Sequence, residues 1–482
     1  MFDFRPAAYV IGLLSLALGC TMVFPMLIDI FDGSPEWWVF GLSGVLTALA
    51  GGSLALACAN SSTSGLSIQQ TFILTTGVWV VLPVFGALPF WFGATDARVV
   101  DGFFEAMSAL TTTGSTVFEG LGDLPRGILL WRGMMQWFGG VGIIVVAMVF
   151  LPMLRVGGMQ IFRSEGFDTM GKILPKAAEI ARQIGVIYVV LTAVCFACYL
   201  AVGMSGFDAL VHAFTTVSTG GFSTEDASFG AFQGPAEYVA TVFMMLASLP
   251  FVRYVQLVAG TAVPLYRDSQ IRAFLMLFAL LVVVLTMYQL VHNHDDLERS
   301  IREALFNVAS ILSGTGYASV NYQSWGNFPM MLFFMMGLVG GCAGSTCCSI
   351  KVFRYELLVK AIVVQIKRLH NPSGVFVLKY NRRSVPDEVI SSVMAFFMLF
   401  LTSLAVLSVA LGMTGLDKVT AISGAATALA NVGPGLGDKI GPSGNFSELN
   451  DIAKWLLAIG MLVGRLELMA VFVLFTANFW RN

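Results

Sequence analysis

Long apolar stretches separated by short polar ones dominate the chain from end to end. A helix needs about 20 apolar residues to cross the hydrocarbon core of a bilayer. Stretches that reach or approach this length occupy residues 7–30, 37–58, 70–93, 128–153, 183–203, 236–265, 271–292, 328–350, 389–413 and 451–478. This pattern predicts an all-α polytopic membrane protein with about ten transmembrane helices.

Four shorter, semi-polar segments lie between these predicted spans. They occupy residues 101–113, 208–220, 303–315 and 417–432. Each begins with an acidic residue and ends next to a glycine, namely Gly114, Gly221, Gly316 and Gly433. Polar backbone at membrane depth is tolerated only where it is buried in protein or lines a water-filled cavity. We therefore expect four re-entrant segments around one shared cavity, each a short helix followed by an extended stretch.

The four glycines recur at intervals of roughly 100 residues, which indicates an internal repeat. One unit consists of a span, a re-entrant segment and a second span, and the first two predicted spans stand outside it. The sequence therefore predicts a two-helix N-terminal extension and four pseudo-symmetric helix–pore-loop–helix repeats around a central pore. These units cover residues 1–65, 66–160, 161–266, 267–383 and 384–482.

The composition agrees with a membrane protein and argues against a soluble enzyme. Charged residues make up 12% of the chain, against about 25% in ordinary soluble domains. Basic residues gather in segments 155–182 and 351–383, whereas acidic residues prevail around the re-entrant segments. Because cytoplasmic loops carry the excess of Lys and Arg, we expect both termini in the cytoplasm and the pore loops facing outside. Since no Ser–His or Asp–Asp pairing occurs at membrane depth, we expect neither enzymatic activity nor a covalent cofactor.

The ends of the re-entrant segments are uncharged and rich in Thr and Gly. They read Thr112-Thr113-Gly114, Thr219-Gly220-Gly221, Gly314-Thr315-Gly316 and Asn431-Val432-Gly433. Glycine permits positive φ angles, so that successive carbonyls can face one side. Rings of such carbonyls replace the hydration shell of an alkali cation. Glycine pairs in membrane proteins often serve close helix packing instead, so the cation-binding hypothesis depends on the four copies together.

These segments carry a resemblance to a known family. The sequences TTTGSTVF (111–118), STGGFST (218–224), SGTGYAS (313–319) and NVGPGLG (431–437) resemble the four selectivity-filter loops of the Trk/Ktr/HKT superfamily of potassium transporters. The resemblance covers essentially the whole chain and is strongest to the TrkH-like bacterial membrane subunits. It implies potassium uptake across the bacterial cytoplasmic membrane. K+ would be held at the twelve residues of the four Thr/Gly stretches, 112–114, 219–221, 314–316 and 431–433. Gly114 favours potassium, because serine at that place goes with sodium permeability in related plant transporters. The fourth segment differs from the others, which implies a filter that is only pseudo-symmetric.

The resemblance also implies partners. It predicts a homodimer and a cytosolic, TrkA-like regulatory ring that carries the nucleotide-binding site. The basic segment 351–383 is a candidate docking surface for that ring, although a cytoplasmic location alone also explains its charge. We expect no nucleic-acid partner, since the net charge of the chain is −2.

A glycine-rich run interrupts the second predicted span of the third repeat. The sequence GLVGGCAGSTCCSIK (337–351) contains Gly337, Gly340, Gly341, Gly344 and Ser345. Such a run breaks or kinks a helix, although its two GxxxG pairs would also suit helix packing. The resemblance implies an intramembrane gate loop over residues 337–349, below the filter. Cys347 and Cys348 depart from the glycines expected there.

A second gate residue is predicted in the last span. Arg465 lies 11 residues after Lys454, which places it about 16 Å deeper along a helix. Charges at this depth usually face the interior of a helix bundle. The resemblance matches Arg465 to an arginine that projects into the pore, whereas the alternatives are an ion pair with Glu467 or an orientation towards the membrane surface. Glu467 is also the candidate ion-coupling carboxylate if the protein is instead a potassium symporter driven by protons or sodium.

Overall fold

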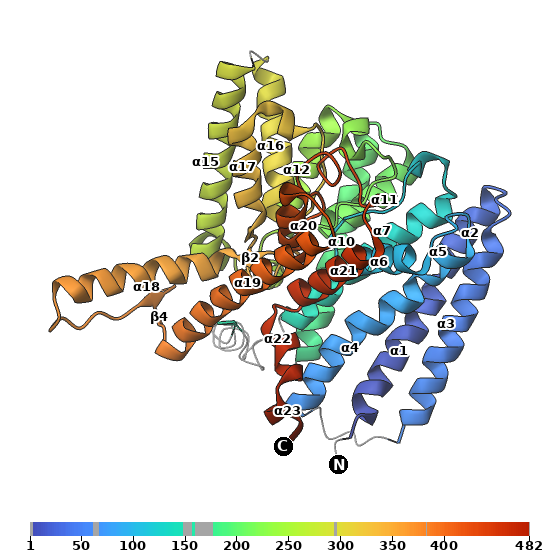
Figure 1. The fold of residues 1–482 in the computed structure, drawn as a ribbon, viewed down its shortest axis with the longest axis horizontal. Coiled ribbons are helices and arrows are strands. Elements are labelled where there is room, and N and C mark those ends of the chain that lie inside the picture. Colours follow the sequence, from blue (N-terminus) through green and yellow to red (C-terminus); the bar gives the residue numbers. More distant parts are fainter. Residues whose placement is uncertain are drawn as a thin grey trace.

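The computed structural model describes residues 3–60, 67–147, 157–159, 177–293, 296–381 and 383–481. Within these ranges the chain is a bundle of helices (Figure 1), and seven helices are long and apolar enough to cross a membrane. Two bent helix pairs and the shorter apolar helix Asn327–Gly337 occupy the three remaining predicted spans. The predicted all-α membrane fold is therefore confirmed. The end of the predicted span 128–153 and most of the basic segment 155–182 lie outside the described residues.

The N-terminal extension packs through small residues. It consists of α1 (Arg5–Thr21), α2 (Val23–Phe31) and α3 (Trp37–Cys58). A Cβ atom on Gly12 would lie 2.7 Å from the backbone N of Ala55, and one on Gly51 would lie 2.5 Å from that of Leu16. Glycine therefore permits the close crossing of α1 and α3, as is common between helices in membranes. Both helices stand at one edge of the bundle (Figure 1).

The four repeats follow in chain order. Repeat 1 contains α4 (Ile68–Gly86), α5 (Leu88–Phe92), α6 (Val99–Leu110), the 3-10 turn η1 (Leu121–Asp123) and α7 (Arg126–Val145). Repeat 2 contains α10 (Ala177–Ala201), α11 (Gly206–Val217), η3 (Ser228–Phe232), α12 (Pro235–Ala247), α13 (Phe251–Val258) and α14 (Val263–Arg267). Repeat 3 contains α15 (Ser269–His292), α16 (Leu297–Ser313), η4 (Tyr322–Trp325), α17 (Asn327–Gly337), β1 (Val339–Gly340), β2 (Ile350–Lys351), α18 (Val352–His370), β3 (Lys379–Tyr380) and β4 (Arg383–Ser384). Repeat 4 contains α19 (Asp387–Met413), α20 (Lys418–Ala430), α21 (Asp451–Arg465), α22 (Met469–Phe472), η5 (Val473–Phe475) and α23 (Ala477–Arg481).

The strands are two-residue pairs. β1 and β2 are parallel, with Val339 opposite Ile350, and they bring together the two ends of the chain segment between α17 and α18. β3 and β4 form an antiparallel hairpin, with Lys379 opposite Ser384.

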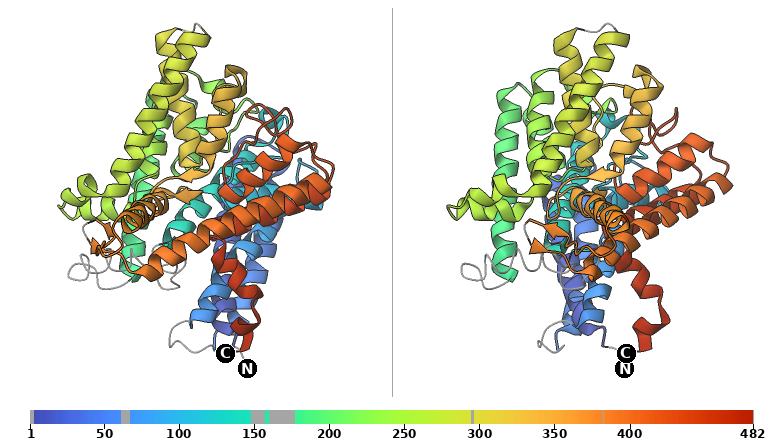
Figure 2. Two further views of the ribbon diagram at one scale, coloured as in Figure 1. Left: turned by 60° about the vertical axis from the view of Figure 1, so that its left-hand side comes forward. Right: turned by 90° about the vertical axis from the view of Figure 1, so that its left-hand side faces the viewer.

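The repeats close into a ring. Within each repeat the short helix (α6, α11, α16 or α20) packs against the helix before it and the helix after it. Between repeats, α7 packs on α11, α12 on α16, and α17 on α20. The ring closes because α21 of repeat 4 packs on α6 of repeat 1. The two termini lie close together at one end of the molecule (Figures 1 and 2), where Gln69 donates a hydrogen bond to the carbonyl of Phe479 over 3.0 Å.

Three predicted spans are broken in the structure. The predicted span 236–265 bends by 88° between α12 and α13, where Pro250 precedes α13. The predicted span 451–478 bends by 103° between α21 and α22, and Arg465 is the last residue of α21 instead of a mid-helix residue. In the predicted span 328–350 the helix ends at Gly337. The GxxxG packing alternative is therefore wrong, because its glycines do not share a helix.

The third re-entrant helix is longer than predicted, since α16 begins at Leu297 and places Glu303 in its interior.

Candidate functional site

The four Thr/Gly stretches share one backbone conformation, and we name them the ring segments (residues 112–114, 219–221, 314–316 and 431–433). The first residue of each segment is left-handed, with φ of 52° at Thr112, 53° at Thr219, 78° at Gly314 and 50° at Asn431. The third residue is again left-handed in three segments, with φ of 86° at Gly114, 79° at Gly221 and 82° at Gly316. Alternation of left-handed with ordinary residues turns successive carbonyls to the same side, which suits cation coordination.

Gly433 departs from this alternation. It is not among the residues with positive φ, and it precedes Pro434, whose ring disfavours helical conformations at the preceding residue. The fourth segment is therefore geometrically different as well as different in sequence. This agrees with the expectation of a ring that is only pseudo-symmetric.

The ring segments contact one another in cyclic order. A Cβ on Gly114 would lie 2.2 Å from the carbonyl O of Gly220, and one on Gly221 would lie 1.8 Å from that of Thr315. A Cβ on Gly316 would lie 2.6 Å from the backbone N of Gly433, and one on Gly433 would lie 3.2 Å from the carbonyl O of Gly114. Segment 1 thus meets segment 2, 2 meets 3, 3 meets 4, and 4 meets 1. The structure brings all twelve predicted residues together around one axis.

A buried carboxylate fastens the chain that follows segment 1. Glu105, in the middle of α6, accepts hydrogen bonds from the Val117 N–H and the Thr116 hydroxyl, each over 2.9 Å. Arg132 of α7 donates to the same carboxylate over 2.8 Å and to the carbonyl of Ser223 in the next repeat over 3.1 Å. Both members of the ion pair are buried, so each neutralises a charge that would otherwise be costly at this position.

In each of the other three repeats, a different polar side chain of the short helix likewise bonds to the chain just beyond the ring segment. His212 lies 3.0 Å from the Ser223 hydroxyl, Asn307 accepts from the Ser319 N–H over 3.3 Å, and Ser423 accepts from the Leu436 N–H over 2.9 Å. We name Glu105, His212, Asn307 and Ser423 the clamp residues. Each lies in a short helix, nine or ten positions before the ring glycine of its repeat. They connect each helix to the chain just beyond its ring segment.

Glu105, Asn307 and Ser423 were not predicted from the sequence. The available signal was a polar residue nine or ten positions before each ring glycine, but the four residue types differ. His212 illustrates the bonding. Its Nδ1 lies 2.8 Å from the carbonyl O of Asp208, which only accepts, so Nδ1 donates to that carbonyl, and Nε2 pairs with the Ser223 hydroxyl.

Further side chains hold individual ring segments. Gln136 of α7 donates to the carbonyl of Gly220 over 2.6 Å and accepts from the N–H of Phe222 over 3.1 Å. The carbonyl of Gly220, predicted to face the ion, is thus already a hydrogen-bond acceptor. Asn431 donates to the Thr113 hydroxyl and to the Met461 carbonyl, each over 2.9 Å, so its amide joins segments 4 and 1 to α21.

A cavity of about 400 Å³ opens above the ring. All four ring glycines belong to its lining, together with Glu119, Glu225 and Asp226. Hydrogen bonds from Ser447 and Asn445 hold the pKa of Glu119 below its usual range. This vestibule therefore carries negative charge at neutral pH and attracts cations to the ring.

On the other side of the ring lies the glycine-rich run, now visible as an intramembrane loop (residues 337–349). Its residues from Gly340 to Cys348 are all buried. The Cys348 thiol lies 3.6 Å from the Thr112 hydroxyl of segment 1, and the N–H of Ser349 donates to the carbonyl of Ala430 over 2.9 Å. A Cβ on Gly340 would lie 1.9 Å from the carbonyl O of Cys348, so the loop folds tightly upon itself.

The same loop is anchored to repeat 2 at the break after α12. The N–H of Cys342 donates to the carbonyl of Ser248 over 3.0 Å, and the N–H of Phe251 donates to the carbonyl of Gly344 over 2.9 Å. Ser345 is buried and its hydroxyl donates to the carbonyl of Cys342 over 2.7 Å. The polar backbone that the broken helices expose is therefore satisfied between two repeats, as non-helical backbone at membrane depth requires.

Arg465 reaches the intramembrane loop. Its side chain is 3% exposed, and its guanidinium donates to the Cys348 thiol, to the carbonyl of Thr346 over 3.5 Å and to the carbonyl of Gly139 over 3.1 Å. Nε of Arg465 has no hydrogen-bond partner among the described residues. Arg465 and the loop were both predicted from the sequence as parts of a gate, and in the structure they meet at Thr346 and Cys348.

The proposed pairing of Arg465 with Glu467 is wrong. Glu467 pairs instead with Arg354 of α18, which is fully buried and also donates to the carbonyl of Gly157 over 2.8 Å. The chain reverses here, because Glu467 and Leu468 both have positive φ, at 57° and 52°. The reversal directs Glu467 away from Arg465.

Comparisons with known proteins agree on one family. Residues 39–482 match the family described as TrkH, cation transport protein. The chain is 42% identical over 479 residues to the Trk system potassium uptake protein TrkI of Halomonas elongata, covering 99% of this chain and 97% of that protein. It is 36% identical to the Trk system potassium uptake protein TrkH of Salmonella typhimurium, covering 99% and 100%. The crystal structure of the potassium transporter TrkH from Vibrio parahaemolyticus matches over 100% of both chains, with a TM-score of 0.91 and 33% identity. The chain therefore belongs to the TrkH family of cation transport proteins.

Proposed function

We propose that this protein takes up potassium across the bacterial cytoplasmic membrane through a gated, channel-like pore. The observation that carries the proposal is the closed cycle of four ring segments at the floor of an acidic vestibule. Backbone carbonyls from four sides can replace the water around an alkali cation. Relatives that match nearly the whole chain are named as potassium uptake proteins, which supports K+ as the ion.

Reconstitution of the protein in planar bilayers tests this proposal. With different potassium concentrations on the two sides, single-channel currents should reverse at the potassium equilibrium potential. Replacing potassium by sodium on one side should shift the reversal potential, because the ring is built for the larger, more easily dehydrated ion. A reversal potential that does not change with the potassium gradient would contradict the proposal.

The intramembrane loop and Arg465 are the proposed gate. The loop residues Gly340, Gly341, Gly344 and Ser345 are buried. Cys348 of the same loop contacts Thr112 of segment 1, and Arg465 adds a positive charge beside Cys348. A buried cation on the ion path repels K+, so the described conformation corresponds to a closed pore. Arg465→Ala removes the charge and three hydrogen bonds to the loop and α7. We expect it to raise potassium conductance, whereas Arg465→Lys retains the charge and should stay closed. Unchanged conductance in Arg465→Ala would contradict the assignment.

A potassium symporter driven by protons or sodium is the alternative function. It needs an intramembrane carboxylate that binds the coupling ion. Glu467, the sequence candidate, is neutralised by Arg354, and this pairing favours the channel. The discriminating measurement is proton flux in proteoliposomes during potassium uptake. A fixed ratio of protons to potassium would support the symporter, and Glu467→Gln would then abolish the coupling.

The projecting helix α18 supports the expected homodimer. It extends away from the bundle in Figure 1, and Val359, Ile362, Val363 and Ile366 form an exposed apolar stripe at helical spacing. A second copy of the chain could bury this stripe. Mass photometry should give a dimer for the unaltered chain and a monomer for Val359→Glu combined with Ile366→Glu. A monomeric unaltered chain would contradict the dimer.

The regulatory ring and the membrane orientation belong to the same proposal. Both termini lie at one end of the molecule (Figure 1), which suits a cytoplasmic location for both, with the vestibule outside. The basic residues in the last turn of α18 would then face a cytosolic, TrkA-like, nucleotide-binding ring. A pull-down with that ring, repeated after Lys367→Glu and Arg368→Glu, tests the contact, since both side chains are exposed.

A further inference from the structure

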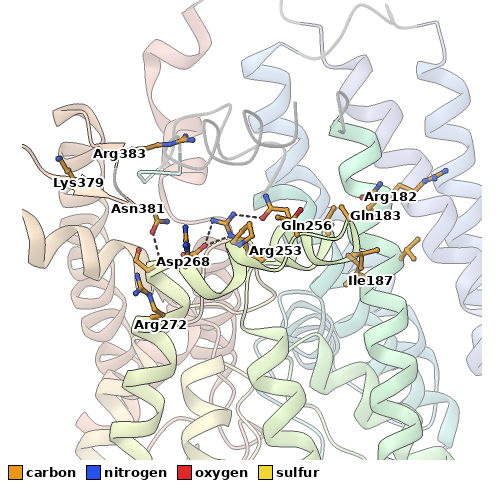
Figure 3. Close-up of a pocket in the computed structure, with 18 of the residues that line it drawn as sticks. Arg182, Gln183, Ile187, Arg253, Gln256, Asp268, Arg272, Lys379, Asn381 and Arg383 are labelled. Carbon is orange, nitrogen blue, oxygen red and sulfur yellow. Dashed lines mark hydrogen bonds and ion pairs between the residues drawn. The ribbon is translucent and has the colours of Figure 1, made fainter. Parts of the chain in front are cut away.

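A large cavity of about 1130 Å³ lies apart from the ring, at the end of α15 that begins with Ser269. Its walls come from the start of α10, from α13 and α14, from the start of α15, and from the β3–β4 hairpin (Figure 3). The described lining residues do not include any ring segment or any residue of the intramembrane loop. The proposed potassium pathway therefore gives this cavity no role.

The cavity is strongly cationic. Its described lining holds seven Arg or Lys side chains and one carboxylate, that of Asp268. The basic residues come from separate elements, with Arg182 on α10, Arg267 at the end of α14, Arg272 on α15 and Arg383 on β4. Lys360 pairs with Glu356 outside the lining, but the exposed basic side chains at the rim repel one another, and an anion bound among them would relieve this repulsion. The arrangement thus points to an anionic ligand.

The one carboxylate in the described lining, that of Asp268, already has partners. Asp268 is buried, pairs with Arg253 over 2.8 Å and caps the N-terminus of α15 by accepting from the Gln270 N–H over 3.2 Å. Gln256 further orients Arg253 by accepting from its guanidinium over 3.1 Å. Arg253, which lies within the predicted span 236–265, is therefore held in place by neighbours from its own repeat and the next (Figure 3).

Most of the positive charge at the rim remains available. Arg267, Arg272, Lys379 and Arg383 are exposed, and they form no ion pair with any residue in the described ranges. Arginine presents a planar fork of donors that matches two oxygens of a phosphate group. The N-terminus of the 24-residue helix α15 opens beside Arg272 and adds positive potential. These donors fit a phosphate group better than a single carboxylate.

One side of the cavity is apolar and open to the surroundings of the bundle. Val186 of α10 and Val258 of α13 line it and are 59% and 79% exposed. Val189 and Val190 continue the exposed apolar surface along α10, which is one of the predicted membrane spans. The 88° bend before α13 turns that helix across the bundle, so its exposed residues lie beside the basic end of α10. A ligand with both a phosphate and hydrocarbon chains would contact both surfaces.

We propose that this cavity binds the headgroup of an anionic phospholipid. The phosphodiester lies among Arg267, Arg272 and Arg383, and the acyl chains follow the valines of α10 and α13. Basic pockets between transmembrane helices on the cytoplasmic side are suited to such headgroups. The site joins elements of repeats 2 and 3 at the base of the helices that support two ring segments, so an occupied site strengthens the contact between those repeats.

Native mass spectrometry of the purified full-length protein tests the proposal with phosphatidylglycerol as the probe. Phosphatidylglycerol should bind, and phosphatidylcholine, which has no net charge, should bind at least about tenfold more weakly. The triple variant Arg267→Gln, Arg272→Gln, Arg383→Gln should weaken phosphatidylglycerol binding at least about tenfold. A matched control, Lys367→Gln, Arg368→Gln, Arg481→Gln, removes three exposed positive charges outside the cavity and should bind as the unaltered chain does.

A further variant tests whether the cavity binds a lipid or a soluble phosphate. Val186→Ser with Val258→Ser keeps every charge and should weaken phosphatidylglycerol binding. Inorganic phosphate added alone at millimolar concentration should not displace the lipid. Equal binding of the two lipids, unchanged binding in the triple variant, or complete displacement by phosphate or by a poly-glutamate peptide would overturn the proposal. Size-exclusion profiles and unfolding temperatures in neutral detergent verify that all three variants are folded, so that weak binding reports on the site.

Discussion

The cyclic contacts of the ring segments predict that the four ring glycines tolerate serine unequally. Gly221→Ser should be the most damaging change. A left-handed conformation costs a residue with a Cβ about 1 kcal/mol, which corresponds to about a fivefold effect on any population. This strain alone would lower transport by no more than about fivefold.

The larger effect of Gly221→Ser comes from its neighbour. The new Cβ would lie 1.8 Å from the carbonyl O of Thr315, where real Cβ contacts do not fall below 3.0 Å. The carbonyl of segment 3 must therefore retreat by more than about 1 Å, and displacements of this size in a preorganised site cost about 100-fold. Gly433→Ser has ordinary backbone geometry, and its closest contacts are already 3.2 Å, so its neighbours need to move by only a few tenths of an ångström.

The assay is potassium-limited growth of a bacterial host that lacks its own uptake systems, together with initial rates of potassium uptake. Gly221→Ser should lower the initial rate at least tenfold, whereas Gly433→Ser should stay within about threefold. The matched control is Gly412→Ser, because Gly412 is exposed and has no heavy atom within 4 Å of the added Cβ. Equal impairment of Gly221→Ser and Gly433→Ser, at equal abundance in the membrane, would refute the reasoning.

Three further predictions concern the clamp residues and the vestibule. Glu105→Gln leaves Arg132 buried without its counter-ion, so the protein in detergent should lose about 3–5 kcal/mol of stability; a thermal midpoint equal to that of the unaltered chain would contradict the pairing. Asn307→Ala removes the bonds to Ser319 beyond segment 3, and selectivity of potassium over sodium should fall while the protein stays folded, as reversal potentials would reveal. Glu119 has a lowered pKa, so its charge is present above the ordinary value of about 4.3 and is lost only as pH falls below it. Uptake at low potassium should therefore stay constant between external pH 5 and 8, and Glu119→Gln should lower it equally throughout that range.

Periodic features of the chain were predictable from the sequence. Apolar length gave the helices, and the recurrence of glycine gave the four ring segments and their equivalence. These features depend on local properties, namely the length of an apolar stretch and the backbone freedom of glycine. Both can be read from the residues themselves without knowing their partners in the fold. The break at Gly337 was predictable for the same reason, since glycines accumulate there.

Features that depend on distant partners were not predictable. The polar run of broken backbone after Ala247 is stable because Cys342 and Gly344, about a hundred residues later, supply its hydrogen bonds. The partner of Glu467 is Arg354, in a different repeat, although Arg465 is two residues away in the sequence. The clamp residues differ in type because each only has to bond a backbone N–H or a hydroxyl beyond its ring segment, and a carboxylate, an imidazole, an amide or a hydroxyl can each do so.

The closure of the ring by α21 against α6 has a consequence for biosynthesis. Repeat 1 is synthesised first, but its short helix gains its last neighbour only when residues 451–465 have entered the membrane. Domains of most proteins fold in order as they emerge from the ribosome, whereas this pore has an open side until the chain is nearly complete. During that interval the polar backbone of the ring segments lacks its final partners within the lipid. Truncation before Asp451 should thus yield an inserted but unassembled chain, which the quality-control proteases of the membrane would recognise by its exposed re-entrant segments.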